Sequence, residues 1–364
     1  MHKSAAWPLA LVYVGLIVYA SLYPFADWRN QGIAPWAFLG APKAHYWSGF
    51  DTAINVAGYA PLGGLLALSA LRAGWSRHSL WIPLLAASML SLTMEILQSY
   101  LPARIPSRED WLLNTGGVAS GAVIVVTLAK WGAIDRWSRV RARWFVPQSR
   151  GGMVLLALWP LSLLFPAAVP FGLGQVLERL ESALGEQLVD TPFLEWLPLR
   201  ETELQPLVPA AELVCVMLGL LIPCLLGFCI IRANARRVVF VLAIVGAGFA
   251  VTALSAALSW GPMHAWAWLG LPVQVGVLGA LLLALGLAFV PWRTSAALLL
   301  LSLGIYLSLL NQAPESAYFA QTLQAWEQGR FIRFHGLAQW LGWLWPYSVV
   351  VYVLSLIWKH DAKN

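Results

Sequence analysis

Long apolar runs are the feature of this sequence that most restricts its fold. The stretch "VCVMLGLLIPCLLGFCI" (214–230) carries no charged residue, and runs of comparable character recur along the chain. About 20 such residues in a helix cross the roughly 30 Å of hydrocarbon in a bilayer. The runs do not alternate between polar and apolar residues, which excludes a membrane barrel. The fold class we predict is therefore all-α, a polytopic helical membrane protein.

The apolar runs and the charges between them indicate how many spans there are and which way they run. Most of the 23 Lys and Arg residues fall on one side if the N-terminus lies in the cytoplasm. In a membrane protein a positive excess such as the formal charge of +6 orients the loops, and it does not suggest nucleic acid. We predict about 10 transmembrane helices with N-in and C-in topology. The expected spans are 7–24, 52–71, 80–101, 112–130, 152–169, 208–231, 238–259, 265–290, 295–311 and 337–358.

A basic segment, "KWGAIDRWSRVRARWFVPQSR" (130–150), divides the chain. We expect a four-helix membrane unit over 1–131, a basic cytoplasmic loop over 132–150 and a six-helix membrane extension over 151–364. Within the extension, 171–189 and 313–336 are predicted as outer amphipathic segments, which either lie along the membrane interface or cap the bundle. Short stretches of spans 2 and 6 are similar in sequence, which suggests that spans 5–8 repeat spans 1–4. The alternative is that apolar helices match by chance.

The unusual polar residues occur in the stretch "EILQSYLPARIPSREDWLLNTGG" (95–117) and at the start of the second span. Pairs three or four residues apart share one helix face, and three such pairs fall at the outer ends of spans 2, 3 and 4. The pairs are Asp51 with Asn55, Glu95 with Gln98, and Asp110 with Asn114. The alternative is that these residues only cap helices or bond between them, and Asp110 is well placed as a cap.

Glu95 is the residue for which burial matters most. We expect it about two turns inside its span, where an ionisable side chain costs about 2.5 to 3.5 kcal/mol. It must then be paired, protonated or facing a wet cleft, and Arg104 is the nearest cation in sequence that could return over it. Nearby glycines are expected to allow close helix contact. They are Gly63, Gly64, Gly116, Gly117 and Gly121.

The spacing D-x3-N-x5-P-x-G followed by E-x2-Q-x5-R-x5-D-x3-N-x2-G resembles the VanZ-like family of bacterial membrane proteins. The first part is carried by Asp51, Asn55, Pro61 and Gly63, and the second by Glu95, Gln98, Arg104, Asp110, Asn114 and Gly117. The resemblance covers spans 1–4. It implies a VanZ-like four-helix membrane unit over 1–131, a multi-pass location in the bacterial inner membrane, a cell-envelope role, and a link to antibiotic resistance through the glycopeptide teicoplanin.

Three functions remain open at this stage. In the first, an enzyme acts on a lipid or lipid-linked envelope substrate, with Glu95, Gln98, Arg104 and Asp110 as catalytic residues and with Asp51, Asn55 and Asn114 binding the substrate. In the second, a non-catalytic accessory protein holds a lipid-linked or glycopeptide ligand at the same place. The third, a transporter, fits less well, because transport sites tend to lie near the midplane. We expect membrane lipids as partners, no cofactor and no metal. Cys215, Cys224 and Cys229 show no metal-ligand spacing.

Overall fold

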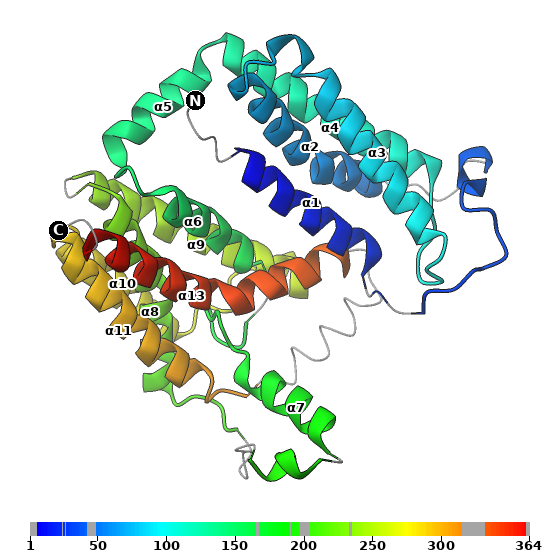
Figure 1. Cartoon of the computed structure of the whole chain (residues 1–364). Coiled ribbons are helices and arrows are strands. Elements are labelled where there is room, and N and C mark those ends of the chain that lie inside the picture. The colour runs from blue at the N-terminus through cyan, green and yellow to red at the C-terminus, as the bar shows by residue number, and fades with distance from the viewer. Residues whose placement is uncertain are drawn as a thin grey trace. The chain divides into compact units, whose positions relative to one another are not determined.

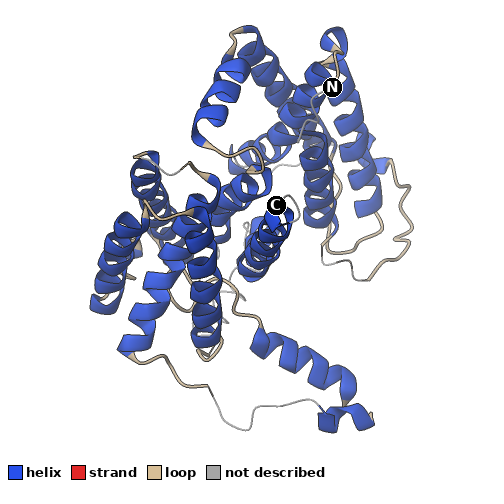
Figure 2. Ribbon diagram, turned by 60° about the vertical axis from the view of Figure 1, so that its left-hand side comes forward, coloured by secondary structure: helices blue, strands red, loops and turns tan. Residues whose placement is uncertain are grey.

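The computed structural model describes residues 6–361 except 24, 26, 42–48, 165–166, 190, 197–203, 233–234 and 315–331. Its regular elements in these ranges are helices, as Figures 1 and 2 show. The chain divides into two compact units, unit 1 over Met1–Arg141 and unit 2 over Ala142–Asn364.

Unit 1 is a group of four apolar helices. These are α1 (Ala6–Leu22), α2 (Gly49–Arg72), α3 (Trp81–Gln98) and α4 (Arg108–Lys130). The short 3-10 turns η1 (Ala37–Gly40) and η2 (Ser76–His78) lie in the connections, and α5 (Ala133–Trp144) crosses the boundary to unit 2. The core of unit 1 is small and apolar, and Leu62, Met94, Leu101 and Val118 are among its buried residues.

Glycine explains why α2 and α4 lie so close together (Figure 1). A Cβ atom added at Gly63 would overlap the backbone of Val118. The same addition at Gly117 or Gly121 would overlap the α2 backbone. The two helix backbones are therefore in direct contact, a packing that small residues permit in membrane helices.

Unit 2 is built around α8 (Pro209–Ile230). Of the apolar window of α8, 83% is buried inside the structure, against 28% for α9 (Arg236–Trp260). Around it pack α6 (Arg150–Ser162), α9, α10 (Leu271–Leu287) and α11 (Trp292–Leu310), and α13 (Ile332–Asp361) packs on α6 and α11. A hydrophobic core cluster that includes much of α8 joins these helices. The remaining elements are α7 (Leu177–Leu188), η3 (Pro192–Trp196) and η4 (Pro262–His264).

Each predicted span overlaps a helix, with differences at the ends, and the all-helical fold is confirmed for the described residues. Among the described residues, six helices are long and apolar enough to cross a membrane, namely α3, α4, α8, α9, α11 and α13, and α1 and α10 are shorter apolar helices. The chain is thus a helical membrane protein with several spans. The number of about 10 spans and the N-in, C-in topology stay predictions.

The fifth predicted span, 152–169, is too long. α6 has 13 residues and ends at Ser162. At 1.5 Å per residue, this length rises only about 20 Å, less than the hydrocarbon thickness. The sequence has Pro160, Pro166 and Pro170 here, and proline lacks the N–H that a helix interior needs.

Three connecting segments differ in detail from the sequence-based expectation. Segment 132–150, predicted as a loop, contains the helix α5. In 171–189 only Leu177–Leu188 is helical, and Leu173 is buried in non-helical chain before it. Leu177 and Leu180 of α7 are exposed. Most of 313–336 lies outside the described residues.

Candidate functional site

Glu95 lies in the last turn of α3 and its side chain is only 4% exposed. Its Oε2 accepts a hydrogen bond of 2.8 Å from the backbone N–H of Ser107, the residue that precedes α4. The chain between α3 and α4 therefore folds back over the carboxylate. A charge-assisted bond of this kind offsets part of the cost of burying an acid.

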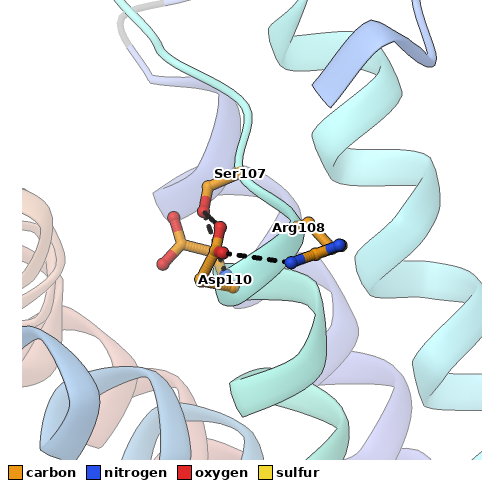
Figure 3. A network of polar contacts seen from close by, with 4 residues as sticks. Ser107, Arg108 and Asp110 are labelled. Atoms are coloured by element: carbon orange, nitrogen blue, oxygen red, sulfur yellow. Dashed lines mark hydrogen bonds and ion pairs between the residues drawn. The ribbon is translucent and has the colours of Figure 1, made fainter. Parts of the chain in front are cut away.

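Ser107, and not Asp110, is the N-cap of α4. Its side-chain oxygen accepts from the backbone N–H of Asp110 at 3.3 Å, the arrangement in which a hydroxyl satisfies a free helix donor. The prediction that Asp110 caps the helix is wrong, because α4 begins at Arg108, before the apolar run. Figure 3 shows Ser107, Arg108 and Asp110 together at this helix end. The positive end of the helix dipole stabilises acidic side chains there. Arg108 pairs with Glu109 at 3.7 Å.

Two of the predicted polar pairs meet between α2 and α4. The side-chain amide of Asn55 on α2 donates to Oδ1 of Asp110 on α4. Asp51 lies one turn before Asn55 on α2, and its side chain lies outside the described residues. The structure thus joins Asn55 and Asp110, as the shared polar end predicted from the sequence requires.

Asn114 is buried one turn further into α4. Its Nδ2 donates to Oγ of Ser91 on α3 at 2.9 Å, and its Oδ1 is buried with no hydrogen-bond partner in the described part of the structure. A buried polar atom that makes no hydrogen bond costs about 1 to 3 kcal/mol. Asn114 therefore has an acceptor available for a ligand donor or a water molecule.

Gln98 and Arg104 contact α1 and the chain that follows it. Nε2 of Gln98 donates to the backbone oxygen of Ser21 at 2.8 Å. The Arg104 guanidinium donates to the backbone oxygen of Tyr23 at 2.6 and 3.1 Å and to that of Ala20 at 3.4 Å. These carbonyls end a helix, where a cation complements the negative end of the dipole. These bonds tie Arg104 to the end of α1 and the chain after it. The expected return of Arg104 over Glu95 stays a prediction.

Asn55 on α2 and Asp110 and Asn114 on α4 thus lie in the first two turns of their helices, and Glu95 and Gln98 lie in the last turn of α3. A family model described as VanZ/LLP1 matches residues 7–129. Residues 7–129 are a VanZ-like region. The match ends one residue before α4 ends, so unit 2 lies outside it. Searches of curated proteins and of solved structures found no significant match to the chain.

Tyr59 belongs to the polar cluster of the VanZ-like region, although the sequence reasoning did not include it. It is buried on α2, and its hydroxyl lies within hydrogen-bonding reach of Ser21 and Ser91. It is also near enough to Glu95 and Asp110 for their charges to act on it. The sequence contained a signal, because Tyr59 follows Asn55 by four residues and so shares its helix face.

No group of three or more His, Cys, Asp or Glu side chains in the described part of the chain could hold a metal ion. The polar cluster of the VanZ-like region combines two carboxylates with amides, serines and one phenol. Its members are Glu95, Asp110, Asn55, Gln98, Asn114, Ser91, Ser107 and Tyr59. The carboxyl groups and the phenol can exchange protons, and all of these groups can hydrogen-bond to hydroxyls and amides.

Proposed function

We propose that the VanZ-like region receives the polar part of a lipid or lipid-linked envelope substrate at the outer face of a bacterial inner membrane, and that Glu95 is the general acid or base. The observation that carries this proposal is the burial of Glu95 in the region that also buries the phenol of Tyr59, on which the charge of Glu95 acts. A carboxyl group and a phenol in one buried site can pass a proton to a bound hydroxyl or phosphate oxygen.

Asn114 supports the same proposal from the binding side. Its Oδ1 is a buried acceptor with no bond, and a substrate hydroxyl or amide N–H would fill it. Asn114 and Glu95 come from facing helices, α4 and α3, and Ser91 touches Asn114 one turn before Glu95 on α3. A substrate would then be held by an amide and acted on by a carboxyl.

Arg104 has a different part in this proposal from the one expected of it. Because its guanidinium bonds to the chain at the end of α1, its role is to position α1 beside the cluster. A phosphate of the substrate would more readily meet Arg108, whose side chain is exposed at the start of α4. Arg–phosphate pairs are strong and directional.

The second candidate is a non-catalytic binding or accessory protein, with an effect on teicoplanin tolerance. It is favoured by the fact that Asn55 and Gln98 bond inside the protein. In this case the cluster would orient the helices, and the ligand would bind and dissociate without being chemically changed. A transporter has less support, since the cluster lies at helix ends.

Glu95→Gln tests the enzyme proposal, because glutamine keeps the shape and the hydrogen-bond acceptor while it removes the proton exchange. The matched control is Glu109→Gln, a carboxylate on the next helix end whose ion pair is with Arg108. Cells carrying each variant would be compared for teicoplanin inhibitory concentration and, by mass spectrometry, for lipid-linked envelope precursors.

The expected result is that Glu95→Gln matches the deletion strain and Glu109→Gln matches the wild type. Normal precursor chemistry and normal tolerance in Glu95→Gln would remove the enzyme proposal. If tolerance fell in Glu95→Gln while no precursor changed even between the wild type and the deletion strain, the accessory role would be correct instead.

A further inference from the structure

A cavity of about 490 Å³ lies in unit 2, where α8 ends and α9 and α11 begin. Its apolar wall includes Val146, Phe228, Cys229 and Leu356, and its polar lining includes Arg232 and Arg237. Ligand sites commonly measure about 300 to 1,000 Å³ and combine apolar walls with a few polar groups. No carboxylate lines this cavity in the described structure.

The walls are held by backbone hydrogen bonds. The chain after α5 pairs antiparallel with the end of α8 through a bridge between Phe145 and Ile231. The N–H of Val146 donates to the oxygen of Ile230 at 2.9 Å, and the N–H of Arg232 donates to the oxygen of Trp144 at 3.0 Å. Val146 and Arg232 are therefore fixed on neighbouring sides of the opening, and the side chain of Arg232 remains exposed there.

Arg237 gives the inner end of the cavity a fixed positive charge. It is 2% exposed and, among the described residues, its hydrogen bonds go to the backbone oxygens of Ile231, Ala288, Val290 and Phe228. These oxygens stand at or just beyond the C-terminal ends of α8 and α10, whose dipoles compensate part of the charge. No carboxylate bonds to Arg237 among the described residues.

Two further arginines are sequence neighbours of cavity-lining residues, Arg236 of Arg237 and Arg293 of Trp292. Arg293 lies 5.8 Å from the ring of Trp292, which lines the cavity, and Arg236 lies 5.9 Å from the ring of Trp144. Asp361, five residues beyond Leu356 on α13, is the acidic residue of that helix. Two arginines, Arg232 and Arg237, therefore line an opening with apolar walls, and this pattern is complementary to an anion that carries a hydrocarbon part.

The position of the cavity at the ends of two apolar helices indicates the source of such a ligand. α8 ends and α9 begins at the cavity, and both are long and apolar enough to cross a membrane. The ends of spanning helices lie at headgroup level, and basic pockets there bind lipid headgroups. A free phosphate would leave the apolar wall uncovered, whereas a phospholipid would cover it.

We propose that this cavity binds an anionic phospholipid, with the phosphate at Arg232 and an acyl chain against Val146, Phe228 and Leu356. Arg237 would add positive potential from below while it holds the helix ends. This site lies in unit 2 and is independent of the function proposed for the VanZ-like region.

The test is native mass spectrometry of the purified full-length protein in a neutral detergent, titrated with phosphatidylglycerol. We expect Arg232→Gln to bind phosphatidylglycerol about tenfold more weakly, as the loss of one charge-assisted contact implies. Arg139→Gln is the matched control, because Arg139 is an exposed arginine of α5 that does not line the cavity. Val146→Trp, which fills the cavity without changing its charge, should weaken binding as well.

Two comparison ligands identify the source of the anion. Phosphatidylcholine, whose headgroup carries no net charge, should bind more weakly than phosphatidylglycerol, and inorganic phosphate should not displace the lipid. Equal affinity of Arg232→Gln and Arg139→Gln would overturn the site. Displacement of the lipid by inorganic phosphate alone, or unchanged binding in Val146→Trp, would overturn the phospholipid assignment.

Discussion

At the scale of single residues, two arginines four positions apart are expected to differ in how much they stabilise the protein. Arg104 donates to carbonyls at the end of α1, whereas Arg108 is exposed and pairs with Glu109 at 3.7 Å. Hydrogen bonds from a charged group are worth about 1.5 to 3 kcal/mol, and an exposed ion pair about 0 to 1 kcal/mol. Arg104→Ala should therefore lower the thermal unfolding midpoint in detergent clearly, and Arg108→Ala should barely change it.

The same pair of variants separates positioning from substrate contact. If Arg104 positions α1, Arg104→Lys should recover part of the stability, because a lysine can still reach the carbonyls with one cation. A normal unfolding midpoint in Arg104→Ala together with lost function would instead return Arg104 to the catalytic group in which the sequence analysis placed it.

Ser107 gives a second prediction at this scale, because it contacts the cluster twice. Its hydroxyl caps α4 and its backbone N–H bonds to Glu95. Ser107→Ala removes the cap and the hydroxyl's bond to Glu109 but keeps the backbone N–H, and it should cost about 1 kcal/mol of stability. Ser107→Pro removes the N–H that reaches Glu95, and so it should reduce function more than Ser107→Ala does. Equal functional loss in the two variants would argue against a role for that N–H.

At the scale of helices, the contact between α2 and α4 depends on which glycine is changed. A Cβ at Gly117 would overlap the backbone of Val56, whereas a Cβ at Gly116 would meet nothing within 4 Å. Gly117→Ala must push the helices apart and should destabilise by about 1 to 3 kcal/mol or more. Gly116→Ala should stabilise by about 0.5 to 1 kcal/mol, because alanine loses less entropy in a helix. Thermal unfolding of the two purified variants measures both signs, and equal shifts would contradict the close contact.

The helices themselves were largely predictable, and their ends were not. The expected span 208–231 matches α8 closely, because the run is apolar throughout and Pro209 suits a first helical position. The expected start of the fourth span, 112, is four residues late, since a hydropathy reading does not register the polar first turn that Ser107 caps. The expected span 265–290 begins six residues before α10, because turns fill the aromatic stretch after Gly261.

For the candidate site, the sequence predicted which side chains share a helix face, and it did not predict all of their partners. Helical spacing put Asn55, Asp110 and Asn114 on the correct faces, and the structure shows their bonds between helices. The partners of Arg104 could not be predicted, because they are backbone oxygens near the end of α1, some 80 positions away in the sequence. Contacts of this kind depend on where helix ends meet in three dimensions, and side-chain patterns carry no information about backbone acceptors.

At the scale of the whole molecule, the proposed function depends on the side of the membrane on which the cluster lies. The predicted N-in topology places the connection between α3 and α4 outside and the segment with α5 inside. Ile105 in that connection is 86% exposed, and Trp137 on α5 is exposed too, so both positions can accept a reactive probe. The native Cys215, Cys224 and Cys229 are buried in α8, which leaves little background labelling.

The prediction is that Ile105→Cys reacts with a membrane-impermeant maleimide in intact cells, and that Trp137→Cys reacts only after the cells are opened. Positive charge sets this orientation, because α5 and its flanks carry several arginines that resist transfer across the membrane. The reverse labelling pattern would place Glu95 and Asn114 at the cytosolic face, where an outer-face envelope substrate cannot reach them. Since α6 is too short to span alone, the same probe placed after Ser162 would also show whether α6 crosses the membrane together with the chain that follows it.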